Sequence, residues 1–282
     1  MKLYRARAFL KEPHGGNKAG VALEVDNLSE VEMQTIAFDV GYSETAFVLP
    51  STKADFKVRF FTPTSEVDLC GHATIATFNV LRDTNVLKPG LYTQETKAGI
   101  LQLDVQEELV YMEQNPPIFS EILTASDVSK CFVDKDFVDT RYPIQVVSTG
   151  LREIFLPVKS VDLLHKLTPD MQAITELSQS YHTIGIHAFS IDDEVDAYGR
   201  NFAPVVGIDE ESATGTSNGA LSCYLYTYKE PRTTYTLRQG YSMNQPSELY
   251  SKIDIKDGNI ERIWVGGKAH LIDNKLQNIR KG

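Results

Sequence analysis

The sequence predicts an α+β protein of two similar halves, each a sheet wrapped around one central helix. Short motifs recur in the same order in the two halves of the chain. Each half also holds one helical segment that lacks a charged face, together with several short segments rich in β-branched and aromatic residues. A helix without a polar face is buried on all sides, so each half needs a surrounding sheet to cover it.

The repeat is visible in four pairs of motifs. RFFTP begins at Arg59 and RNFAP begins at Arg200, an offset of 200 − 59 = 141 residues. The other three pairs have offsets of 138 to 144: residues 33–34 with 171–172, 46–47 with 188–189, and 70–73 with 214–217. Four pairs in the same order favour a duplicated domain over chance similarity among common residues.

The secondary structure of each half follows from local patterns. Residues 28–40 open with Ser29 and Glu32 at the spacing of a capping box, and apolar residues then recur at helical intervals. Residues 45–50 and 56–61 are typical of strands. The segments 71–81 and 216–228 are the two buried helices.

The boundary between the halves is expected at the Asn115-Pro116-Pro117 segment, because proline interrupts regular structure. This divides the chain into an N-terminal half, residues 1–116, and a C-terminal half, residues 117–282. The last strand is left open to return to the N-terminal half.

Composition excludes several classes of function. The net charge of −10 argues against a nucleic-acid partner, which needs clustered Lys and Arg. No stretch is apolar for long enough to cross a bilayer, and the N-terminus lacks the apolar core of a signal peptide. Three scattered cysteines are too few for a disulfide framework, which favours a cytoplasmic protein.

The stretch DLCGHAT, residues 68–74, combines an acid, a thiol and an imidazole at the predicted start of the first buried helix. Cys70 and His72 are only two ligands, without a partner motif, so no metal site is expected. Cys70 is either a thiol catalyst or a small buried residue. The start of a helix offers unpaired amides to a carboxylate or an oxyanion, and the equivalent start near Gly215 does the same. Two such starts are expected to face a cleft between the halves.

Carboxylates and glycines elsewhere give weaker signals. Glu44 precedes a predicted strand, and on residue type alone it is more typical of a solvated loop than of a catalyst. Glu210 and Glu211 precede the second buried helix, where acids are common as partners of the helix dipole. The GxGxxG motif is absent, and Gly15-Gly16 reads as a turn, so no nucleotide cofactor is indicated.

Five blocks of the sequence resemble the PhzF-like family, which is named for the phenazine-biosynthesis isomerase. They are GNKAGVAL at 16–23, SETAF at 43–47, FFTPTSEVDLCGHAT at 60–74, GIDEESATGTSNGAL at 207–221 and RQG at 238–240. Their order and spacing match along almost the whole chain. The resemblance implies the diaminopimelate epimerase-like fold, in which each half is a rolled, mostly antiparallel sheet around a central helix. It also implies a homodimer.

The resemblance assigns roles to individual residues. It implies that Glu44 is the catalytic acid/base and that Ser43, Gly71 and His72 line the substrate site. In the second half it implies substrate contacts from Glu211, Gly215 and Thr216. The related epimerases use two opposed cysteines; Cys70 matches the first of these positions and Thr214 the second.

The second helix motif departs from the family pattern, which is close to DPATGSA. Glu211, Ser212 and Thr216 replace the family's Asp, Pro and Ser. An added methylene at Glu211 and an added methyl at Thr216 should make the pocket smaller. These changes put the family's named substrate in doubt more than its chemistry.

The resulting hypothesis is a cofactor-independent isomerase that moves a proton within a small carboxylic acid. Glu44 would take the proton, and partial burial is expected to raise its pKa towards neutrality. The helix starts at Gly71 and Gly215 would hold the substrate carboxylate, while His72 and Glu211 would orient its hydroxyl or amino groups. The alternatives are an amino-acid epimerase or racemase, against which Thr214 counts, and a non-catalytic protein that binds a small ligand.

Overall fold

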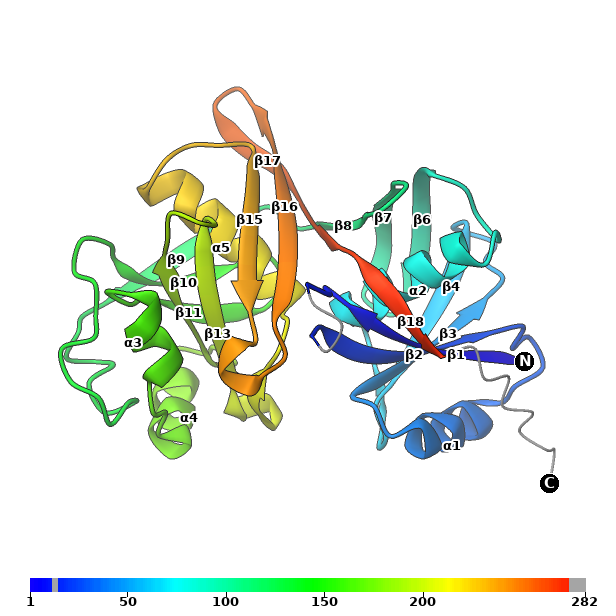
Figure 1. Ribbon diagram of the computed structural model, residues 1–282. Coiled ribbons are helices and arrows are strands. Elements are labelled where there is room, and N and C mark those ends of the chain that lie inside the picture. The colour runs from blue at the N-terminus through cyan, green and yellow to red at the C-terminus, as the bar shows by residue number, and fades with distance from the viewer. Residues whose placement is uncertain (12–14, 274–282) are drawn as a thin grey trace. The chain divides into compact units, whose positions relative to one another are not determined.

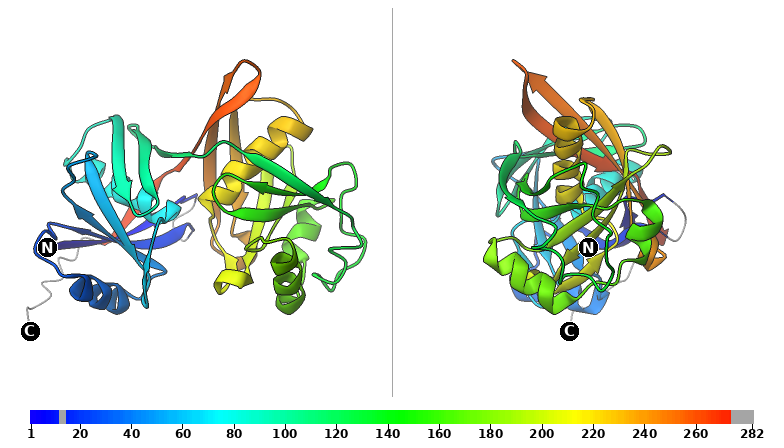
Figure 2. Two further views of the ribbon diagram at one scale, coloured as in Figure 1. Left: turned by 180° about the vertical axis from the view of Figure 1, so that it is seen from behind. Right: turned by 90° about the vertical axis from the view of Figure 1, so that its left-hand side faces the viewer.

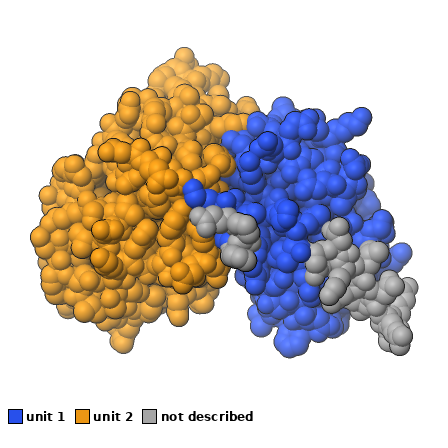
Figure 3. Space-filling view, viewed as in Figure 1, with its two compact units in different colours: residues 1–113, 266–282 blue, residues 114–265 orange. Residues whose placement is uncertain are grey.

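The computed structural model describes residues 1–11 and 15–273. The chain forms two compact units, shown in different colours in Figure 3. Unit 1 holds residues 1–113 and the chain from residue 266 onward, and unit 2 holds residues 114–265. Where the sequence suggested a boundary at residue 116, the chain leaves unit 1 after Glu113 and comes back to it at Gly266.

Unit 1 is a sheet with two helices, and most of its strands pair antiparallel (Figure 1). Its elements are β1 (Lys2–Ala8), β2 (Asn17–Leu23), α1 (Glu30–Val40), β3 (Glu44–Leu49), β4 (Phe56–Phe61), β5 (Glu66–Val67), α2 (Gly71–Asp83), β6 (Gly90–Thr96), β7 (Gly99–Val105), β8 (Val110–Gln114) and β18 (Ala269–Asp273). The strands pair in the order β18-β1-β2-β3-β4-β6-β7-β8, with β5 also paired to β4. Only β2–β3 and β4–β6 are parallel among these pairs.

Unit 2 repeats this pattern of strand pairing. Its elements are β9 (Ile118–Leu123), β10 (Ile144–Ser148), β11 (Arg152–Pro157), α3 (Val161–Lys166), α4 (Met171–Ser180), β12 (Ile186–Ile191), β13 (Ala197–Ala203), η1 (Pro204–Val206), β14 (Ile208–Glu211), α5 (Gly215–Tyr228), β15 (Thr234–Gln239), η2 (Tyr241–Met243), β16 (Ser247–Lys256) and β17 (Asn259–Gly267). The strands pair in the order β9-β10-β11-β12-β13-β15-β16, and the parallel pairs β11–β12 and β13–β15 occupy the same places as in unit 1. The predicted fold class, two similar α+β halves, is confirmed.

In each unit the strand at one edge of the pairing order directly follows the last strands of the other unit in the sequence. In the order of the chain β9 follows β8 of unit 1, yet it pairs with β10 of unit 2. In the same way β18 follows β17 and pairs with β1 of unit 1. Each sheet is therefore completed by a strand that directly follows the strands of the other half.

Both central helices are buried, as the sequence predicted, and the strands of each unit surround them (Figures 1 and 2). Polar side chains of α2 are tolerated because they bond to the helix's own backbone. Thr74 Oγ1 donates to Cys70 O at 2.8 Å, Thr77 Oγ1 donates to Ala73 O at 2.7 Å, and Asn79 Nδ2 donates to Ile75 O at 2.8 Å. These bonds spare the buried groups the cost of losing water without a partner.

The repeated R-x-F-x-P motif holds the same ion pair in both units. Arg59 on β4 binds Glu66 on β5, with Nη2 at 2.7 Å from Oε2. Arg200 on β13 binds Glu210 on β14, with Nε at 2.8 Å from Oε1. The duplicated arginine thus fastens a short strand that leads into the central helix of each unit.

The remaining local predictions concern α1 and the membrane. Ser29 and Glu32 form the predicted capping box at the start of α1. In the part of the chain that the structure describes, no helix is both long and apolar enough to span a membrane.

Candidate active site

The start of α2 carries one end of the candidate site. Cys70 is the residue before the first turn, with an extended backbone, and its side chain does not cap the helix. Gly71 begins the helix, and a Cβ added there would meet nothing closer than Met112 Cε at 3.7 Å. Packing therefore does not require glycine at this position. That a ligand approaches the backbone here stays a prediction.

Glu44 reaches the start of α2 because of the turn after α1 and the pairing of β3. Gly41 ends α1 in the left-handed conformation, with φ of 64°, and lets the chain turn into β3. Glu44 is the first residue of β3, which pairs in parallel with β2 so that Ala19 lies beside Glu44. The same pairing brings Asn17, at the start of β2, into the group.

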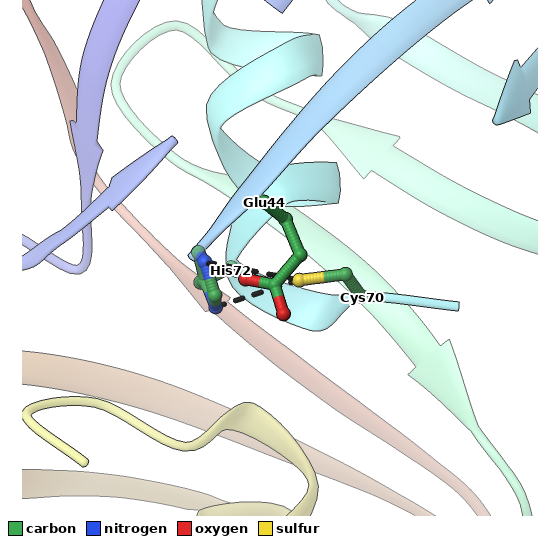
Figure 4. A group of neighbouring side chains, drawn as sticks. All are labelled: Glu44, Cys70 and His72. Atoms are coloured by element: carbon green, nitrogen blue, oxygen red, sulfur yellow. Dashed lines mark hydrogen bonds and ion pairs between the residues drawn. The ribbon is translucent and has the colours of Figure 1, made fainter. Parts of the chain in front are cut away.

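His72 is the centre of this group (Figure 4). Its Nε2 lies 3.0 Å from Glu44 Oε2 as an ion pair and 3.3 Å from Ser43 Oγ. Its Nδ1 lies 3.1 Å from Asn17 Nδ2, and Cys70 Sγ lies 3.5 Å from the same nitrogen. The ring is therefore held from both of its nitrogen atoms.

Glu44 combines burial with an oxygen that remains available to accept a proton. Its side chain is 17% exposed, and Oε2 is buried without an aligned hydrogen-bond donor among the residues that the structure describes. His72 lies close enough for an ion pair, but its N–H does not point along a hydrogen bond to that oxygen. A carboxylate oxygen that is not engaged in a hydrogen bond can accept a proton from a group placed next to it.

The protonation states follow from this geometry and correct one expectation. Burial acts to raise the pKa of Glu44, but the adjacent His72, helped by Ser43 and Cys70, outweighs burial, and the pKa is lowered. The prediction of a raised pKa was wrong because it counted burial alone and not the imidazole. Burial acts to lower the pKa of His72, yet the adjoining Cys70 side chain and the negative charge of Glu44 raise it well above its usual value. Both shifts favour the charged forms, the carboxylate of Glu44 and the protonated imidazole of His72.

Cys70 is a poor candidate for the reacting group. Burial raises the pKa of its thiol to about 11, so the thiol is protonated at neutral pH. A thiol catalyst needs a thiolate, and this environment disfavours it.

A nuclear magnetic resonance titration tests the ion pair. We expect His72 to titrate above the usual imidazole value in the wild type and at lower pH in Glu44→Gln, because the variant removes the negative charge. The sign for stability follows: the contribution of a raised His72 pKa is present below pH about 6.5 and is lost as the pH rises through the folded-state pKa. Equal pKa values of His72 in the two proteins would contradict the ion pair.

The predicted residues of the second half lie in unit 2. Glu211 ends β14, and its Oε2 accepts a hydrogen bond from Thr214 Oγ1 at 2.6 Å. Gly215 begins α5, and the carbonyl of Thr216 accepts from Thr149 Oγ1 at 3.1 Å. The structure brings these three residues together at the start of α5. A substrate site shared with Glu44 stays a prediction.

Sequence reasoning gave no role to two residues that organise these groups. Asn17 contacts His72, and its only signal was its place in the GNKAGVAL block. Gln239 lies in the RQG block and holds the start of α5: its Oε1 accepts from Asn218 Nδ2 at 2.7 Å, and its Nε2 donates to Glu211 O at 2.6 Å. Neither contact follows from spacing, because both partners are distant in the sequence.

Comparison with known proteins gives the family. The family model described as phenazine biosynthesis-like protein, PhzC-PhzF, matches residues 6–274. An uncharacterized isomerase of Clostridium acetobutylicum is 38% identical over 240 residues, which cover 80% of each chain. The trans-2,3-dihydro-3-hydroxyanthranilate isomerase of Pseudomonas fluorescens is 27% identical over 275 residues, which cover 93% of this chain and 94% of that one.

Solved structures agree. A phenazine biosynthesis protein of the PhzF family from Bacillus anthracis is similar with a TM-score of 0.87 and 31% identity, over 97% of both chains. A probable proline racemase from Agrobacterium radiobacter shares the fold alone, with a TM-score of 0.62 and 13% identity over 99% of this chain and 94% of that one. The chain therefore belongs to the phenazine biosynthesis-like family, PhzC-PhzF, and is an isomerase of that family.

Proposed function

We propose that this isomerase moves a proton within a small unsaturated carboxylic acid, with Glu44 as the single acid/base and without a cofactor. The observation that carries the proposal is the buried Oε2 of Glu44, which has no aligned hydrogen bond among the described residues and belongs to a carboxylate that His72 keeps ionised. Such an oxygen can accept a proton from a C–H group next to a π-system.

The reaction balances with Glu44 alone. The carboxylate takes the proton from one carbon, which leaves a delocalised carbanion and a neutral Glu44. Glu44 then returns the proton to a different carbon on the same face, so the double bond moves and no atom is gained or lost. The positive charge of His72 and the amides at the start of α2 stabilise the anion between the two steps.

The substrate class follows from the relatives and from the departures in unit 2. The Pseudomonas fluorescens relative is named for an amino- and hydroxyl-bearing cyclic acid. We propose an acid of that general class that is smaller or differently substituted, because Glu211 and Thr216 are each larger than the family's residue. The site in this proposal includes Ser43, Gly71 and His72 of unit 1 and Glu211, Gly215 and Thr216 of unit 2, at the cleft that the sequence predicts.

An epimerase with two thiols is the weaker candidate. Thr214 occupies the second thiol position, and the raised pKa of Cys70 keeps the first one protonated. A protein that binds the acid without reaction is the other alternative, and proton exchange distinguishes it from an isomerase.

Solvent-deuterium incorporation tests the proposal. The protein is incubated in D₂O with a panel of dihydroaromatic acids and amino acids and with a small-molecule extract of its host, and mass shifts are measured. We expect a shift of one or more deuterons in an unsaturated acid with an acidic C–H group, and none in its saturated analogue. Binding of an acid without any incorporation would favour the ligand-binding alternative.

The proposal also includes the cellular compartment and the oligomeric state of the enzyme. All three cysteines are free thiols, which agrees with a reducing, cytoplasmic compartment. We propose that the active form is a homodimer, and light scattering of the purified protein measures its mass directly.

A further inference from the structure

Three different metal-binding side chains meet at the start of α2 (Figure 4). One donor atom from each of Glu44, Cys70 and His72 can be chosen so that all three lie within 4.8 Å of one another. In the part of the chain that the structure describes, no other group of three such residues satisfies this condition. The sequence argument against a metal counted only Cys70 and His72, because Glu44 reaches them through the folding of β3.

The spacing of the donor atoms suits a tetrahedral ion. Around Zn²⁺, bonds of 2.0–2.3 Å place neighbouring N, O and S donors roughly 3.3–3.8 Å apart. His72 Nε2 lies 3.0 Å from Glu44 Oε2 and 3.8 Å from Cys70 Sγ, and the same Sγ lies 3.5 Å from Nδ1. A rotation of the Cys70 side chain towards Nε2, together with a small opening of the Glu44–His72 pair, would admit the ion. Three protein ligands leave a fourth position for water.

The surroundings already hold the imidazole as a metal site would. A ligating histidine commonly has a hydrogen-bond partner at its other ring nitrogen, which fixes the orientation of the ring. Asn17 lies 3.1 Å from His72 Nδ1, and Nε2 is the nitrogen that lies beside Glu44. Its amide oxygen can accept the Nδ1 proton after a flip of the amide group.

We propose that Glu44, Cys70 and His72 form a Zn²⁺ site, and that the bound ion inhibits the isomerase. A thiol and an imidazole select a soft or borderline ion such as Zn²⁺ over Mg²⁺ or Ca²⁺. Binding releases the thiol proton of Cys70 and the imidazolium proton of His72 to solvent, with no change in oxidation state. The inhibition rests on the proposed function: a carboxylate oxygen bound to zinc cannot accept a proton from the substrate.

The role of Cys70 in binding is tested with Co²⁺, which reports a thiolate ligand by a charge-transfer absorption band. The variant Cys131→Ala/Cys223→Ala retains Cys70 alone and removes two buried cysteines of unit 2. We expect the variant and the wild type to show the band, Zn²⁺ to remove it, and Cys70→Ala to lack it. A band that persists in Cys70→Ala, or no band in the wild type, would overturn the site.

Calorimetry with Zn²⁺ gives a second test that does not depend on the cysteine variants. The isosteric change Glu44→Gln removes one ligand and should weaken Zn²⁺ binding by at least about 10–100-fold, the loss that removal of even a supporting group causes. The matched change Glu108→Gln alters an exposed carboxylate of unit 1 that pairs with Lys268, and it should leave the affinity unchanged. Equal affinities in wild type and Glu44→Gln would exclude Glu44 as a ligand.

The deuterium experiment, repeated with Zn²⁺, separates this inference from the proposed function. Deuterium exchange that occurs without zinc, and that stops when one equivalent of Zn²⁺ per protein chain is added, supports the inhibitory site. Undiminished exchange by zinc-loaded protein overturns the inhibition. A cobalt band together with no exchange under any condition supports the metal site and contradicts the isomerase mechanism.

Discussion

Glu44→Gln should slow proton exchange with the substrate by about 10²–10⁴-fold, the usual contribution of a positioned acid/base group. Gln has nearly the same shape as Glu but cannot accept the proton, so binding of the substrate should survive the loss of rate. The measurement is the rate of deuterium incorporation into the substrate identified with the wild-type protein, at equal concentrations of folded protein.

The matched control is Glu108→Gln, which makes the same change on an exposed carboxylate of unit 1 and should leave the exchange rate unaltered. Circular dichroism verifies that both variants are folded. Exchange that persists at the wild-type rate in Glu44→Gln would rule out the single-carboxylate mechanism and return attention to Cys70.

Arg200→Leu should destabilise unit 2 by about 3–5 kcal/mol, the cost of removing one partner of a buried ion pair. The Arg200 side chain is 7% exposed, and both oxygens of Glu210 accept hydrogen bonds from it at 2.8 Å. Its Nη1 also donates to the carbonyls of Leu164 and Leu167, at 3.1 and 2.7 Å. The variant leaves the Glu210 charge and two carbonyls without this donor.

Urea unfolding measures the effect on the transition of unit 2. Lys159→Leu is the control in the same unit, because its side chain is 40% exposed and its partner Asp136 is 91% exposed. An exposed pair contributes about 0–1 kcal/mol, so this variant should unfold close to the wild type. A similar decrease in the free energy of unfolding in the two variants would show that the buried Arg200 pair stabilises unit 2 no more than an exposed pair does.

Local sequence patterns predicted much of the fold. The capping box of Ser29 and Glu32 involves two residues only three positions apart, so it can be predicted from local sequence. The two buried helices can be predicted because their sequences lack a polar face. The R-x-F-x-P motif recurs because its arginine forms an equivalent ion pair in each unit, through Arg59 in unit 1 and Arg200 in unit 2. The detailed strand order was not predictable in this way, because no local sequence pattern indicates which strands β9 and β18 pair with.

Sequence motifs likewise predicted which residues form the candidate site, but not the interactions between them. Glu44, Gly71 and His72 were named from their motifs, and the structure brings them together at the start of α2. Their electrostatic state was missed, because the pKa of Glu44 depends on an imidazole 28 residues away that lies beside it only after α2 packs against β3. The third possible metal ligand was missed for the same reason.

The return of the chain to unit 1 through β18 affects the order in which the two units can fold during biosynthesis. β18 pairs Asp273 with Arg5, residues separated by 273 − 5 = 268 positions, so β1 lacks one of its two neighbours until β18 has left the ribosome. Closing a loop of this length costs entropy that only the finished sheet repays. Unit 2 is one continuous segment, residues 114–265, and can fold first, whereas unit 1, which carries Glu44 and His72, is completed only after unit 2 has been made.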